Sequence, residues 1–217
     1  VNNGEKHSLV QVLNSAFNEL NEVRQSRKFK EEIRSHVRLS EGSFKTIKKY
    51  VTASKNANES LNVVCVDLIV DAEIGLGVAN MVFAQFKQAI RRRKALDLKG
   101  FIWKLELSFD DKFYYHCIFF LKAEESVDTS ELAKNILQIW NEKIGSYSSN
   151  FNIPASGQLS HFKDLAVGSV DPSDEGTYEQ LFNFIRYLCK KDQFIVHKSL
   201  SGKSTFGKGR SPSIRKH

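Results

Sequence analysis

Apolar residues recur along the first part of the chain with the spacing of a helix. From about Ser8 to Leu39 they return every three or four residues and give way to a charged run. The residues of this stripe are Leu9, Val12, Leu13, Phe17, Leu20 and Val23. Ser40 offers an N-cap for a second helix, and residues 56–60 form a polar break. The pattern predicts a helical N-terminal appendage over residues 1–60.

Two regions in the middle of the chain have the composition of β-strands. Leu61 to Val70 is rich in β-branched residues and too apolar for the edge of a sheet, so we expect a central strand there. Gly100 to Leu121 alternates apolar and polar residues on either side of Asp110 and Asp111. This second region indicates two strands joined by a tight turn.

The length of that turn decides which side chains meet across the hairpin. A two-residue turn, 110–111, would place Glu106 opposite Tyr115, whereas a three-residue turn, 110–112, places Glu106 opposite His116. The hydrophobic pattern favours the second, because it gathers the apolar side chains on one face. The apolar face then carries Trp103, Leu105, Leu107, Phe109, Phe113, Tyr115, Cys117 and Phe119. The polar face carries Lys104, Glu106, Ser108, Tyr114 and His116.

Further helices and short strands complete the predicted order. Helices are expected over 74–95, from Asp128 to about 144, and over about 175–190, with short strands over 163–170 and 194–197. This order, β, α, ββ, α, β, α, β, predicts an α+β fold with a central, mostly antiparallel sheet covered by helices on one face. We divide the chain into the appendage 1–60, an α+β domain 61–198 and a basic tail 199–217.

Composition narrows the class of protein. The chain has 217 residues, of which 41% are hydrophobic and only three are proline, which indicates a globular domain. No apolar run approaches the ~20 residues that a membrane span needs, so we expect no membrane segment. Cys65, Cys117 and Cys189 lie in apolar stretches without CxxC spacing, as buried thiols do in a reducing compartment. We therefore expect a cytoplasmic location.

Positive charge is concentrated in two places. The net charge is +7, with one basic run at the end of the predicted helix 74–95 and a second near the C-terminus. Such runs suit a phosphate backbone, although a solvated helix end and a plain basic tail would look the same. The residues we expect to contact DNA are Arg91, Arg92, Arg93, Lys191, Lys203, Lys208 and Arg210.

The polar face of the hairpin carries a cluster of acid-base groups, Glu106, Tyr114 and His116. A histidine beside a glutamate on a sheet is more often a structural pair than a metal site. A metal site is made more plausible by the predicted helix 175–190, where Tyr187 and Lys190 form a Tyr-x-x-Lys motif on the polar side. That motif would present a phenol to a metal held by the strands.

Five blocks of the sequence resemble the inovirus Gp2-like family, also called the YagK/YfjJ C-terminal domain family. They lie in the family's order between about Leu61 and Ser211. The blocks are VCVDL at 64–68, GFIWKLE at 100–106, FYYHCIFF at 113–120, YLCKKDQ at 187–193 and STFGKGRS at 204–211.

The resemblance implies a fold and an activity. The family is similar to rolling-circle replication initiators of the HUH endonuclease class, found in filamentous phages, prophages and satellites. These enzymes have an HUH/RRM-like antiparallel sheet, use Mg²⁺ or Mn²⁺, nick one DNA strand and keep its 5′-phosphate on a tyrosine. By resemblance, the His-x-His pair falls on Tyr114 and His116, and Glu106 is the neighbouring acidic position. Tyr187 matches the nucleophile and Lys190 the motif lysine.

Tyr114 departs from the family pattern, because a neutral phenol is a poor ligand for Mg²⁺ or Mn²⁺. Two functions therefore stay open: a metal-dependent tyrosine nickase acting on single-stranded or hairpin DNA, and a binding module that kept the fold and lost the metal site. Asp67 would be either a substitute oxygen ligand or a hydrogen-bonding group of the core. A polymerase-like palm using Asp67, Asp71 and Glu106 is a third hypothesis. The N-terminal helices are a candidate docking arm for a protein partner.

Overall fold

The structure is a computed structural model that describes residues 3–56, 60–123, 128–148, 157–159, 168–190 and 204–209. Its helices are α1 (Asn3–Gln25), α2 (Arg27–Asn56), α3 (Gly75–Arg92), α4 (Thr129–Ser148) and α5 (Glu175–Cys189), with 3₁₀ turns η1 (Ala72–Ile74) and η2 (Lys94–Leu96). Its strands are β1 (Leu61–Asp71), β2 (Leu98–Leu107), β3 (Lys112–Lys122), β4 (Gly157–Leu159), β5 (Gly168–Val170) and β6 (Phe206–Lys208).

The strands form one antiparallel sheet in the order β4-β1-β3-β2-β6, with β5 pairing a separate part of β1. Every residue from Leu61 to Val70 is buried, which confirms the predicted central strand. The chain therefore has the expected α+β class with an antiparallel sheet and an N-terminal helical part.

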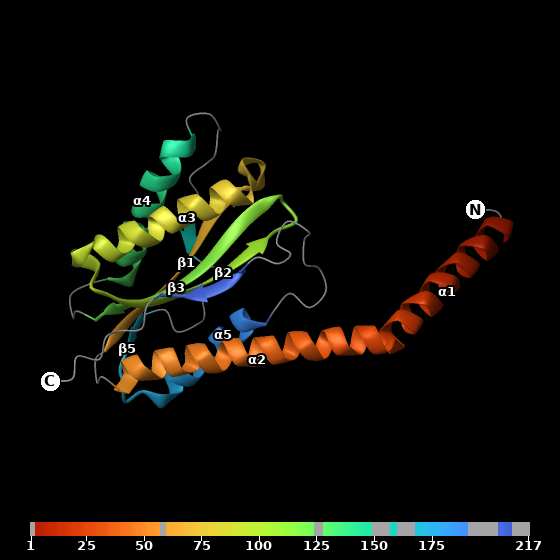
Figure 1. Ribbon diagram of the computed structural model, residues 1–217, viewed down its shortest axis with the longest axis horizontal. Helices are drawn as coiled ribbons and strands as arrows, with labels where there is room; N and C mark the ends of the chain where they lie inside the picture. The colour runs from red at the N-terminus through yellow and green to blue at the C-terminus, as the bar shows by residue number, and fades with distance from the viewer. Residues whose placement is uncertain are drawn as a thin grey trace.

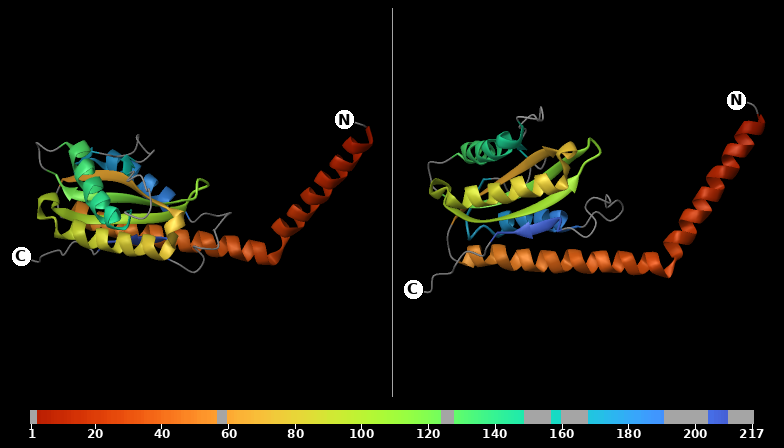
Figure 2. Two further views of the ribbon diagram at one scale, coloured as in Figure 1. Left: turned by 90° about the horizontal axis from the view of Figure 1, so that it is seen from above. Right: turned by 45° about the horizontal axis from the view of Figure 1, so that its top comes forward.

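Helices cover both faces of the sheet and not one face as predicted, because α2 packs on the sheet beside α5 (Figures 1 and 2). The α3/α4 face packs side chains such as Val66 and Tyr115 against Phe83 and Trp140. The α2/α5 face packs others, such as Val63, against these two helices. Alternation along each strand sends neighbouring residues into different cores, because successive side chains point to opposite faces. Buried apolar side chains make up most of both faces of the sheet, and the charged side chains among them are exceptions.

The turn between β2 and β3 lies one residue earlier than predicted. The pairs are Leu107 with Phe113, Glu106 with Tyr114 and Lys104 with His116. The backbone amide of Ser108 donates to the carbonyl of Lys112 at 2.9 Å, which leaves residues 109–111 as the turn. Asp111 adopts the left-handed conformation, φ 55°, that three-residue loops require and that Asp tolerates.

This shift corrects two predictions about the hairpin. Glu106 does not lie opposite His116, and Phe109 does not join the apolar face because it is 97% exposed in the turn. All other side chains keep their predicted faces, because the register moves by two residues and the side-chain period is two. Glu106 and His116 remain on one face, as diagonal neighbours.

The break between the N-terminal helices lies at Ser26 rather than at Ser40. The Ser26 hydroxyl accepts a hydrogen bond from the amide of Phe29 at 3.2 Å and so caps α2. Ser40 lies inside α2, which runs on without interruption. The C-terminal half of this helix is held by burial against the sheet and α5, through Phe44, Ile47, Tyr50 and Val51.

Strand β6 was missed because it falls in the segment predicted to be a basic tail. It pairs with the outer edge of β2, opposite Ile102 to Lys104. Gly207 permits this approach, since a Cβ there would lie 2.7 Å from the Trp103 ring. The predicted strand 194–197 lies outside the described residues, and of 163–170 only 168–170 is described, as β5.

We predict that Gly207→Ala lowers the free energy of unfolding by about 1 to 3 kcal/mol, because the new methyl group overpacks against the Trp103 ring. Gly77→Ala is the control. Gly77 lies in α3 with nothing within 4 Å of its Cβ position, so that change should be neutral or stabilising by up to about 1 kcal/mol. Urea unfolding followed by tryptophan fluorescence measures both. Equal changes in the free energy of unfolding for the two variants would contradict the close approach of Gly207 to the Trp103 ring.

Candidate functional site

Four charged side chains from the three central strands touch on the α2/α5 face. His116 Nδ1 lies 2.8 Å from Asp67 Oδ1, and His116 Nε2 lies 3.3 Å from Glu106 Oε2. The Lys104 ammonium pairs with the other oxygen of Glu106. The register explains this contact, since His116 on β3 lies between Asp67 on β1 and Lys104 on β2. We call these four residues the ion-pair chain.

The charges of the ion-pair chain alternate and support one another. The exposed fraction of the side chain is 1% for Asp67, 9% for Lys104 and 16% for His116. Charges this deep are tolerated only when paired, because desolvation costs several kcal/mol per ion. Each interior member of this row contacts an opposite charge on both sides. Removal of His116 would take from the buried Asp67 carboxylate the opposite charge that it contacts.

Protonation follows from these contacts. Burial alone would lower the pKa of His116, but its hydrogen bonds to Asp67 and Glu106 raise the pKa to about 9. Burial alone would raise the pKa of Glu106, but hydrogen bonds from His116 and Lys104 lower that pKa to about 2. At neutral pH the site therefore holds an imidazolium between two carboxylates.

The ion-pair chain does not fit the Mg²⁺ or Mn²⁺ that the resemblance implies. The two imidazole nitrogens face different carboxylates, so an ion at Nε2 could be reached by Glu106 but not by Asp67. Lys104 already neutralises Glu106. No group of three His, Cys, Asp or Glu side chains able to hold a metal ion occurs in the described part of the chain. Mg²⁺ is usually bound by one or two carboxylates together with waters or phosphates, but here both carboxylates already face the imidazole and Glu106 also pairs with Lys104.

Tyr114, predicted as a third ligand, turns its hydroxyl to the hairpin turn. That hydroxyl donates to Asp110 Oδ2 at 3.4 Å, while the phenol ring stacks on the His116 imidazole with centroids 5.9 Å apart. Tyr114 thus covers the imidazole without offering it an oxygen. The structure brings Glu106 and His116 together and gives Tyr114 a packing role beside them.

Asp67 takes the hydrogen-bonding role foreseen for it. One carboxylate oxygen contacts His116, and the other is buried with no hydrogen-bond partner among the described residues. Asp71 caps η1 by accepting from the amide of Glu73 at 3.0 Å. The carboxylates of Asp67, Asp71 and Glu106 therefore serve separate contacts, which removes the geometric basis of a polymerase-like palm.

Helix α5 crosses the same face of the sheet and ends beside the ion-pair chain. Leu188, Cys189 and Lys190 line a cavity together with Lys104. Tyr187, in the last turn of α5, is 54% exposed, as predicted for a residue outside the buried stripe of the helix. Of the predicted Tyr-x-x-Lys motif, Lys190 therefore lies at the Lys104 end of the ion-pair chain, whereas Tyr187 is not among the described residues that line this cavity.

This cavity continues into a second one along α2 and β6, since Leu39, Ser43 and Phe206 line both. Their volumes are about 200 and 500 Å³. We call the combined surface the α2–β6 groove. Its basic residues are Arg38, Lys104, Lys190 and Lys208, and its hydroxyl residues are Ser40, Ser43, Thr46, Ser204 and Thr205. None of the described residues lining it is acidic.

The groove contains residues that sequence reasoning overlooked. Arg38 and the row Ser40, Ser43 and Thr46 lie on α2, where they were counted as part of an appendage. Their spacing of three residues on one helix face was the available signal. It pointed to no function until β6 was placed beside the helix.

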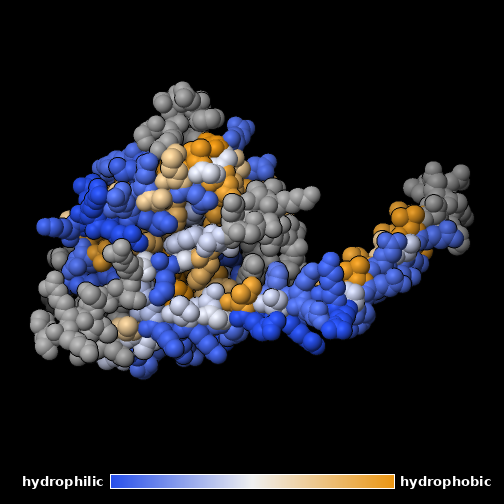
Figure 3. Space-filling view, viewed as in Figure 1, coloured by the Kyte–Doolittle hydropathy of each residue, from blue (hydrophilic) through white to orange (hydrophobic). Residues whose placement is uncertain are grey.

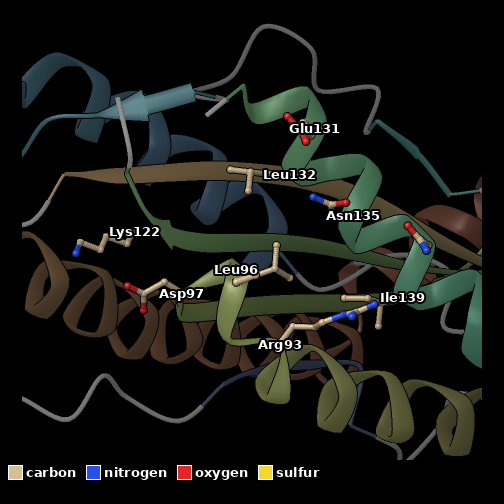
Figure 4. Close-up of a pocket in the computed structure, with 10 residues that line it drawn as sticks. Arg93, Leu96, Asp97, Lys122, Glu131, Leu132, Asn135 and Ile139 are labelled. Atoms are coloured by element: carbon tan, nitrogen blue, oxygen red, sulfur yellow. The ribbon is translucent and has the colours of Figure 1, made fainter. Parts of the chain in front are cut away.

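The predicted arginine run does not join the groove as a unit. The Arg91 guanidinium lies 5.5 Å above the Phe101 ring, and Arg93 approaches Glu142 of α4 at 3.9 Å. Arg93 lines a different cavity, of about 350 Å³, whose lining includes residues of both charge signs, such as Lys122 and Glu131 (Figure 4). Arg92 is exposed. Lys191, Lys203 and Arg210 lie outside the described residues.

Comparison with other proteins gives no further information about this site. No protein-family model matches the chain, and no curated protein or solved structure is similar enough to count as a match. Within the described residues, no helix combines the length and the apolar character needed to cross a membrane.

We predict that His116→Gln destabilises the fold in a pH-dependent way. Because the folded-state pKa of His116 is raised from 6.5 to about 9, the stability it contributes is complete below pH 6.5 and is lost as the pH rises through about 9. The difference in melting temperature between wild type and variant should be largest near pH 6 and much smaller near pH 10. Thermal unfolding across this range measures it. A difference independent of pH would mean that His116 is not held as an imidazolium.

Proposed function

We propose that this protein is a DNA-binding domain of the rolling-circle initiator type, which holds single-stranded DNA along the α2–β6 groove. The observation that carries the proposal is the lining of that groove, which holds three exposed cations, Arg38, Lys190 and Lys208, and a row of hydroxyl groups, with no carboxylate among the described lining residues. The fourth basic residue, Lys104, is paired with Glu106. Cations release counterions from phosphates, and hydroxyl groups donate hydrogen bonds to phosphate oxygens.

A single strand suits this groove better than a duplex. Phe206 is partly buried where the two cavities meet, with Lys208 two residues further along the same strand. Aromatic rings beside a basic track are the usual means by which proteins bind unpaired bases and their backbone. The groove is also bounded by a helix and a sheet edge, which favours a flexible strand over a rigid double helix.

The topology supports the likeness to initiators. The order β1-α3-β2-β3-α4-β4 with strands arranged 4-1-3-2 is that of the split βαβ fold, in which both helices cover one face of the sheet. The other face is the one that binds nucleic acid in RRM-like domains. In this chain α2 and α5 cover much of that other face, and the α2–β6 groove lies beside it.

Nicking is a second candidate, and the position of α5 favours it. The helix that carries Tyr187 and Lys190 ends at the groove, next to Lys104. The poor fit of the ion-pair chain to a divalent metal weighs against it, so we propose binding without strand cleavage for the wild-type chain.

We predict that Lys208→Gln and Arg38→Gln each weaken binding to single-stranded DNA and reduce its salt dependence. Loss of one phosphate contact should lower the slope of log K against log salt concentration by about 0.7. Lys134→Gln is the control, because Lys134 is exposed on α4 over the opposite face of the sheet. Fluorescence anisotropy with a labelled oligonucleotide at several salt concentrations measures the slopes. Equal slopes for all three variants would place the DNA elsewhere.

We predict that wild-type protein incubated with single-stranded DNA and Mn²⁺ forms no covalent adduct in a denaturing gel. Tyr114→His restores an imidazole beside His116 and tests whether the missing ligand alone prevents nicking. An adduct formed by the wild-type chain and lost in Tyr187→Phe would establish nicking as the function instead. DNA binding measured on the same samples separates failure of cleavage from failure of binding.

A further inference from the structure

Helix α1 exposes a row of large apolar side chains although it belongs to a chain with two well-packed cores. It leads away from the sheet, beyond the end of α2 (Figures 1 and 2). The exposed fraction is 60% for Leu9, 59% for Leu13, 64% for Phe17 and 69% for Leu20. In Figure 3 the apolar residues of this arm gather along one side of it. Contiguous apolar surface of this kind marks a contact with another molecule.

Part of the apolar row, together with Ala16 and Val23, has the spacing of a coiled coil, and Phe17 lies beside this seam. Leu9, Leu13, Ala16, Leu20 and Val23 follow one another at steps of four, three, four and three residues. This 3.5-residue period keeps one seam facing a partner helix over its whole length. The next position in the series is Arg27, which lies beyond the break at Ser26. The apolar seam therefore ends where α1 ends, as expected if α1 is a unit of association.

The charges beside the seam favour an identical helix in parallel orientation. With Leu13 and Leu20 as a positions, Glu19 is a g position and Arg24 is the following e position. In a parallel pair, the g residue of one helix faces the e residue five positions later on its partner. Glu19 of each copy would thus meet Arg24 of the other, twice by symmetry.

The polar side of the helix argues against a membrane or DNA as the occupant. Between Leu9 and Val23 there is no lysine or arginine, while Glu19 and Glu22 are acidic. Helices that lie on anionic membranes carry basic residues on the polar face, and nucleic acid requires them also. A second copy of the chain supplies both the matching seam and the matching charges.

We infer that α1 pairs with α1 of a second copy in a parallel coiled coil over residues 9–23. The pairing buries the exposed apolar row and leaves the α2–β6 groove of each copy outside the contact. This inference does not depend on whether the α2–β6 groove binds DNA.

Sedimentation velocity on the full chain tests the pairing. We expect a dimer for the wild type and a monomer for Leu13→Glu combined with Leu20→Glu. Both leucines are exposed in the single chain, so the fold should survive, which circular dichroism can check. Gln11→Glu combined with Asn18→Glu adds the same charge on the exposed outer side of the helix and should stay dimeric. A monomeric wild type, or a dimer that persists in the leucine variant, would overturn the inference.

Cysteine crosslinking tests the orientation. The native cysteines are all buried, so a new thiol on α1 reacts separately. Val23→Cys should form a disulfide-linked dimer on mild oxidation, because a parallel pair brings residue 23 of both helices together. Asn18→Cys, on the outer side, should not. No crosslink at residue 23 would exclude the parallel pair. Co-sedimentation of the wild type, but not the leucine variant, with anionic vesicles would make a membrane surface the occupant instead.

Discussion

The pairing of β3 with β1 on one side and β2 on the other is the constraint on which the rest of the structure depends. Because side chains alternate along a strand, this register decides at once which residues enter each core and which charged groups meet. It places Asp67, His116 and Lys104 in one row across three strands. A slip of one residue would bury Glu106 and His116 against α3 and expose apolar partners on the other face.

Burial then determines the chemistry of that row. An imidazole shared between two carboxylates is held protonated, and a lysine compensates the outer carboxylate. The charged side chains of this row compensate one another, whereas a catalytic metal site must leave donor atoms that can bind the ion. Tyr114 acts in the same direction, since its hydroxyl bonds to Asp110 while its ring covers His116.

The α2–β6 groove has a different origin, because it joins segments far apart in sequence. Strand β6 attaches to β2 through close packing at Gly207, and α2 is held nearby by its own buried residues. The last turn of α5 closes one end with Lys190. A region first taken for an appendage, Ser40 to Val51, and another taken for a tail, Ser204 to Gly209, together line a cavity that has basic but no acidic residues among its described lining.

The sequence by itself determined the elements that depend on local pattern. β-Branched, apolar composition marked β1, period-two alternation marked the hairpin faces, and helical spacing marked α4 and α5, because these signals act between residues close along the chain. Tertiary structure decided what needed distant partners. Ser26 and Ser40 offer equal caps, and only the packing of Phe44 and its neighbours keeps α2 continuous through Ser40. The turn position, the pairing of β6 and the meeting of Asp67 with His116 depend on the free energy of contacts across the sheet, which no local pattern carries.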